Sequence, residues 1–118
     1  MLSLNHKLLD VWKLSLEIIK KIYRITENFP DREKFGIINQ LRRASVSIAS
    51  NIAEGSSRKS PTERKRFYEI ARSSVVEIDT QLEISLMLNF VRKQEISDFE
   101  SNLIRLFKML TSLINHTK

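Results

Sequence analysis

The chain has 118 residues, enough for one domain with its own core, and we take residues 1–118 as a single unit. Only two glycines and two prolines interrupt a sequence rich in aliphatic and charged residues, a composition that favours helices over a turn-rich β fold. The chain contains no cysteine, which excludes disulfides, thiol nucleophiles and cysteine zinc sites. Its two histidines, His6 and His116, lie near opposite ends, so we expect no metal and no cofactor.

The formal net charge is +6, which favours anionic partners or serves solubility alone. No apolar run approaches the length that crosses a membrane. Residues 1–13 mix apolar with polar and charged side chains and lack the apolar centre of a secretory signal. We therefore expect a cytoplasmic protein with no membrane partner.

The first predicted helix, at about residues 9–28, carries two neighbouring apolar seams. One contains Leu8, Trp12, Leu16, Ile19, Tyr23 and Thr26, and the other contains Val11, Leu14, Ile18, Ile22 and Ile25. Together they span about 200° of the helix, more than the roughly 100° that one core face needs. Either this helix is central to its own bundle, or the second seam contacts another subunit. Under the latter interpretation, Ile18→Lys would separate the subunits and leave a helical monomer.

The second predicted helix, at about residues 32–54, follows a break at Phe29 and Pro30. Gly36 falls inside it, and Gly55 is predicted to end it in the left-handed conformation. An apolar stripe runs down one side through Ile38, Leu41, Ser45, Ile48, Ala49 and Ile52. The other side is polar but has little bulk, with Gln40, Arg43, Ser47, Ser50, Asn51 and Glu54. We expect another element to pack against this polar side.

The third predicted helix, at about residues 61–88, begins with Ser60 as cap, Pro61 in the first helical position and Glu63 to complete a capping box. Asn89 is predicted to end it in the left-handed conformation, with Phe90 folding back. The fourth, at about residues 94–114, has regularly spaced apolar residues but no good cap among residues 92–95. Short connections make consecutive helices antiparallel, so the predicted fold is an all-α, up-down-up-down four-helix bundle.

Several short motifs resemble those of a known family. They are Trp12, Phe29-Pro30, Gln40-Leu41-Arg42-Arg43-Ala44, Ser47-Ile48, Asn51-Ile52-Ala53-Glu54-Gly55, Ala71-Arg72, Ser74 and Glu77. The chain resembles the bacterial four helix bundle proteins encoded in intervening sequences of large-subunit ribosomal RNA genes. It departs from their pattern at Ala49, where proline is common, and at Ser73, where glycine is common.

The resemblance implies a homopentameric ring and no established enzymatic activity. This family is in turn similar to the accessory proteins of diversity-generating retroelements, basic pentamers thought to bind nucleic acid and a reverse transcriptase. A shared fold does not by itself transfer a function, so these properties are expectations.

The densest group of basic residues surrounds the connection between the second and third helices. It contains Arg58, Lys59, Arg64, Lys65 and Arg66, and Arg72 follows two turns later. In a ring these cations would repeat and bind RNA or DNA phosphates with avidity. The alternative is a solvated basic loop without a ligand.

A second polar group contains Arg43, Asn51, Glu54 and Glu77, and we interpret it as a structural cluster held by hydrogen bonds at or beside a subunit boundary. No nucleophile or tuned acid and base accompanies it, so we expect no enzyme. Three functions stay open: an oligomer that binds nucleic acid, a scaffold that binds an unidentified protein with no nucleic-acid role, and, with least support, an enzyme of unknown class.

Overall fold

The computed structural model describes residues 1–118, except for the side chain of Leu8, and the described residues form helices and no strands. The four long helices are α1 (Asp10–Thr26), α2 (Ile37–Ser57), α3 (Pro61–Met87) and α4 (Lys93–His116). Two 3-10 turns, η1 (Asn5–Leu8) and η2 (Asp31–Glu33), precede α1 and α2. The predicted all-α fold of four helices is confirmed; the seam position assigned to Leu8 lies outside the described side chains. None of the described helices is both long enough and apolar enough to cross a membrane.

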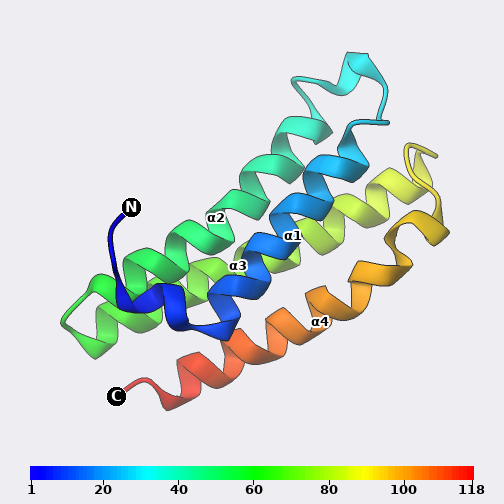
Figure 1. Cartoon of the computed structure of the whole chain (residues 1–118). Helices are drawn as coiled ribbons and strands as arrows, with labels where there is room; N and C mark the ends of the chain where they lie inside the picture. The colour runs from blue at the N-terminus through cyan, green and yellow to red at the C-terminus, as the bar shows by residue number, and fades with distance from the viewer.

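Each long helix packs against two others. Helices α1 and α3 both contact α2 and α4, so α1 lies diagonally across from α3. The two termini of the chain lie at the same end as the α2–α3 connection (Figure 1). We call this end, with the connection at residues 58–60, the connector end. The connections α1–α2 and α3–α4 lie at the other end of a body about 43 Å long.

All four helices contribute to the core, and α1 buries its second seam fully but its first seam only in part. The largest fully buried side chains include Ile18, Ile22, Leu41, Ile48, Ile52, Ile78, Ile96, Phe99, Leu106 and Leu110. In the other seam of α1, Leu16 is 36% exposed and Tyr23 is 39% exposed. The interpretation that places Ile18 against another subunit is therefore wrong. Ile18 points between the neighbouring helices of its own bundle, and the exposed apolar residues lie on the first seam.

Both glycines of the α2 region have roles that differ from the predicted ones. Residues 31–33 form the turn η2, and α2 begins only at Ile37, with Gly36 as its N-cap instead of an interior residue. Gly55 is not left-handed; it is buried in the last turn of α2. A Cβ atom there would lie 2.7 Å from Cε1 of Tyr68, so this position allows α3 to approach the backbone of α2 closely. The helix continues to Ser57.

The end of α3 has the conformation that its local sequence predicts. Asn89 has a φ of 60°, as predicted. The Phe90 N–H donates to the Ser85 carbonyl at 2.9 Å and the Asn89 N–H donates to the Leu86 carbonyl at 3.1 Å, the paired bonds of a Schellman motif. The ring centroids of Phe90 and Phe29 lie 5.8 Å apart, which brings the end of α3 onto the end of α1.

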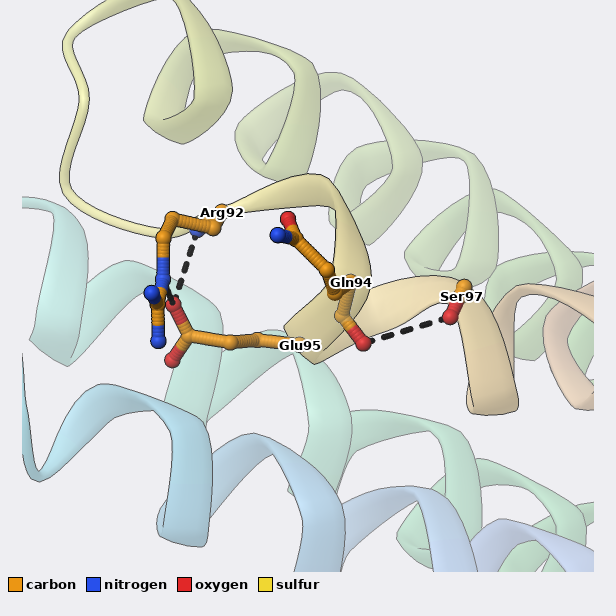
Figure 2. A network of polar contacts seen from close by, with 4 residues as sticks. All are labelled: Arg92, Gln94, Glu95 and Ser97. Atoms are coloured by element: carbon orange, nitrogen blue, oxygen red, sulfur yellow. Dashed lines mark hydrogen bonds and ion pairs between the residues drawn. The ribbon is translucent and has the colours of Figure 1, made fainter.

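Helix α4 begins with a cap that the sequence interpretation missed. Glu95 Oε1 accepts hydrogen bonds from the Arg92 backbone N–H at 3.0 Å and from Arg92 Nε at 3.1 Å, and Ser97 Oγ donates to the Gln94 carbonyl (Figure 2). The backbone bond and then the side-chain bond lower the pKa of Glu95. Because the folded pKa is the lower one, this contact stabilises the fold above the unfolded pKa and is lost as the pH falls through the folded pKa.

Candidate nucleic-acid interface

The first cation of the connector end, Arg58, is held in place by two partners. Its Cζ atom lies 4.9 Å from the ring centroid of Phe67, at the start of α3. Its Nη2 atom lies 3.2 Å from Oε2 of Glu54, one turn back along α2. Both Arg58 and Glu54 are exposed, so the pair contributes little stability but fixes where the guanidinium points.

Arg64 holds the connector end together instead of pointing freely into solvent. Its Nη1 atom donates to the carbonyl oxygens of Arg58 at 3.1 Å and Lys59 at 2.7 Å. Its Nη2 atom donates to the carbonyl oxygen of Lys118 at 3.2 Å. The last described residue, Lys118, is therefore brought beside the α2–α3 connection. The local sequence does not predict this contact, because 54 positions separate Lys118 from Arg64 and only the direction of α4 brings them together.

The remaining cations of this end form its accessible part. Lys59 and Arg66 are exposed, and Lys65 is half-buried. Lys65 and Arg66 line a shallow hollow of about 490 Å³ together with Glu69, a single carboxylate. Among the described side chains, Lys59, Lys65 and Arg66 form no ion pair within 4.0 Å. This arrangement leaves their charges available to an anion from outside.

Arg72 lies away from this group. Its Nη1 atom donates to Thr111 Oγ1 at 3.1 Å, and its Cζ atom lies 5.7 Å from the ring centroid of Phe107. Both partners belong to α4. Arg72 therefore joins α3 to α4, whereas Arg58, Lys59, Arg64, Lys65 and Arg66 are brought together at the connector end, with Lys118.

The second predicted group does not form one network. Arg43 and Glu77 line the same hollow of about 310 Å³ between α2 and α3. Asn51 instead donates to the carbonyl oxygen and to Oγ of Ser47, at 2.8 and 3.0 Å. Glu54 turns toward Arg58 and belongs with the connector end. The four residues thus divide between two places on the surface.

Helix α3 covers one edge of the low-bulk polar side of α2. Ser74 Oγ donates to Ser47 Oγ at 3.0 Å. Further along α3, Gln81 Nε2 donates to Glu77 Oε1 at 3.1 Å and lies 3.4 Å from Gln40 Oε1 of α2. The small side chains of α2 therefore pack against α3 in part, while Arg43, on the same side of α2, stays exposed.

The chemistry that these residues offer is the binding of anions. Guanidinium and ammonium groups from the end of α2, the α2–α3 connection and the start of α3 lie together at one end, and phosphate oxygens are their usual ligands in nucleic acids. Among the described side chains, no group of three or more His, Asp or Glu residues is placed to hold a metal ion.

Comparison with known proteins identifies the family. A family model described as "23S rRNA-intervening sequence protein" matches residues 7–112. No curated protein matches. A crystal structure from Bacteroides thetaiotaomicron, of a protein with unknown function from the S23 ribosomal protein family, is similar, with a TM-score of 0.78 and 23% identity. That comparison covers 88% of this chain and 97% of the other, and it supports the fold. The match over residues 7–112 shows that the chain belongs to the 23S rRNA-intervening sequence protein family, as its motifs indicate.

Proposed function

We propose that the protein is a non-enzymatic, cytoplasmic oligomer that binds nucleic acid through its connector end. The observation that carries the proposal is the grouping of cations from the end of α2, the α2–α3 connection and the start of α3, with Lys59, Lys65 and Arg66 accessible. Most protein contacts to nucleic acids go to phosphate and sugar, and charge neutralisation supplies much of the affinity. Either RNA or DNA offers the required phosphates.

The proposed subunit is the antiparallel, up-down-up-down bundle, assembled as the homopentameric ring that the resemblance implies. A ring would repeat the connector end around its axis, so that several weak phosphate contacts act together on one strand. The exposed apolar residues Leu16 and Tyr23 on α1 support an assembly, because they leave part of that helix without a partner.

The first test removes two accessible ammonium groups from the connector end. We expect Lys59→Ala with Lys65→Ala to weaken binding of labelled RNA and DNA about tenfold or more at physiological salt. On duplex DNA each lost phosphate contact makes the negative slope of log K against log salt shallower by about 0.9, so the pair makes it shallower by about 1.8 per bound subunit. Fluorescence titrations at several salt concentrations measure both quantities.

A matched control removes the same charge from the opposite end. Lys34 and Lys93 are exposed and lie beside the α1–α2 and α3–α4 connections. Lys34→Ala with Lys93→Ala should leave binding nearly unchanged. Equal losses in the two double variants would mean that net charge alone, and not the connector end, attracts nucleic acid.

A protein-interaction scaffold is the alternative function, because an acidic partner protein would also bind these cations. Salt dependence alone does not separate the two, since both kinds of partner bind through charge. Absence of RNA and DNA binding by the unaltered protein, at low as well as physiological salt, would favour the scaffold. Competition between free RNA and any partner protein would then decide whether they share the connector end.

A further inference from the structure

One side of the bundle, between α1 and α2, presents apolar residues beside cations. Leu16, Tyr23 and Val46 are 36%, 39% and 40% exposed. Tyr23 and Val46 line a hollow of about 520 Å³ with Arg42 and Arg43, and no carboxylate lines it. We call these five residues the cationic face.

The cationic face is ordered within the single chain. Arg42 Cζ lies 4.5 Å from the ring centroid of Tyr23, and its Nε atom donates to Thr26 Oγ1 at 2.9 Å. This hydrogen bond and the cation–π contact hold the guanidinium in one position before any partner arrives. A prepositioned side chain loses less conformational entropy on binding.

The side between α3 and α4 presents apolar residues beside carboxylates. Val76, Ile104 and Phe107 are 51%, 57% and 39% exposed. Together with Asp79 and Glu100 they line a groove of about 310 Å³, which Lys108 also borders. We call these three apolar residues and two acids the acidic groove.

The two surfaces lie on opposite sides of the molecule. Both α1 and α3 contact α2 and α4, so the α1–α2 side faces away from the α3–α4 side (Figure 1). Each combines exposed apolar area with charge. The acidic groove offers the carboxylates of Asp79 and Glu100, with Lys108 and Arg72 also beside it, whereas no carboxylate lines the hollow of the cationic face. The cationic face would meet like charges if it packed against a second cationic face, which disfavours a symmetric two-fold contact.

We propose that the cationic face of one copy packs into the acidic groove of the next copy, as a heterologous, head-to-tail interface. Val46, Leu16 and Tyr23 then cover Val76, Ile104 and Phe107, while Arg42 and Arg43 lie beside Asp79 and Glu100. Heterologous contacts generate a ring when the rotation between copies closes and a filament when it does not. The inference rests on the oligomeric part of the proposed function and is independent of the cations at the connector end.

The test uses one charged substitution in each surface. We expect Val46→Lys, in the cationic face, and Ile104→Glu, in the acidic groove, each to reduce the mass in solution from that of the oligomer to that of one chain. Light scattering after size exclusion measures the mass, and far-ultraviolet circular dichroism checks that the helices remain. If either variant unfolds, Leu16→Ser or Val76→Ser replaces it.

Mixing the two variants gives the decisive result. The Val46→Lys chain keeps an intact acidic groove, and the Ile104→Glu chain keeps an intact cationic face. An equimolar mixture therefore has one working pair of surfaces and should form a dimer of one chain of each kind, with no larger species. A two-fold contact between like surfaces cannot give this outcome.

Three outcomes would overturn the proposal: either folded variant keeps the full oligomer, the mixture stays monomeric, or the control variant also dissociates. The control is Ile84→Glu, which alters a 38% exposed aliphatic residue on α3 outside both surfaces. A monomeric unaltered protein would refute both this interface and the oligomer of the proposed function. Nucleic-acid binding is measured separately on the monomeric variants. If they still bind, more weakly because avidity is lost, the assignment of binding to the connector end holds even if this interface is refuted.

Discussion

The Ile18→Lys variant is expected to be unfolded. The side chain of Ile18 is fully buried in the core, and the bundle offers no acidic partner among the buried residues there. Burying an unpaired ammonium costs several kcal/mol, and losing the isoleucine contacts adds about 2 kcal/mol. Because domains are stable by only about 5–15 kcal/mol, this single change removes much or all of the stability. Far-ultraviolet circular dichroism and urea titration would show the loss of helix and of a cooperative transition.

The matched control for Ile18→Lys is Leu16→Lys, on the exposed seam of the same helix. Leu16 is 36% exposed, so its lysine variant can extend the ammonium into water and should retain the helical spectrum and cooperative unfolding. A folded, helical Ile18→Lys monomer would contradict the assignment of this seam to the core and would restore the subunit contact that its periodicity suggested.

The Phe99→Ala variant is expected to lose about 3–5 kcal/mol of unfolding free energy, the usual cost of truncating a buried phenylalanine. Phe99 is 1% exposed and is the largest of the fully buried side chains, so its removal leaves a cavity that the surrounding helices fill only in part. Urea unfolding of both proteins at the same protein concentration measures the change, because the apparent stability of an oligomer depends on that concentration.

Phe35 provides a control with the same atoms removed and the opposite burial. It is 89% exposed in the turn before α2, and Phe35→Ala should change the unfolding free energy by no more than about 0.5 kcal/mol. Similar losses at the two positions would mean that burial does not decide the cost, and would contradict the placement of Phe99 in the core.

Local chemistry explains which helix ends could be predicted. A serine cap followed by proline places the start of α3 at Pro61, where the structure has it, and Ser60 Oγ accepts from the Glu63 N–H at 3.4 Å. At the other end, an asparagine tolerates the left-handed conformation better than most residues, and Asn89 adopts it. Both signals depend on neighbours within a few positions, so the sequence contains all that is needed.

The roles of the glycines depended on contacts that no local pattern contains. A glycine permits both a left-handed helix end and the close approach of another helix, and Gly55 serves the second because Tyr68 of α3 lies against it. Long-range contacts also determine which of the two seams of α1 lies in the core. Their periodicities are equally helical, and the positions of α2 and α4 decide that Ile18 is buried and Leu16 is not.

The candidate site could be predicted only where its residues lie close together in the sequence. Arg58, Lys59 and Arg64 are close along the chain and lie together in the structure, joined by the hydrogen bonds of Arg64. Lys118 joins them through the fold, and Arg72 leaves them because its side chain reaches Thr111 of α4. The density of charge along the sequence thus identifies which end of the bundle is basic. It does not identify which cations form hydrogen bonds within the protein and which are free to bind an anion.

The close packing of α2 against α3 makes the two halves of the bundle unequal in the sequence changes they can absorb during evolution. Gly55 leaves no volume for a larger side chain, and Ser47 and Ser74 are joined by a hydrogen bond that an apolar replacement would remove. In α4, by contrast, large aliphatic residues such as Leu106 and Leu110 can exchange for others of similar volume at a cost below about 1.5 kcal/mol. Descendants of this chain can therefore drift further in α4 than along the seam between α2 and α3 while keeping the same fold.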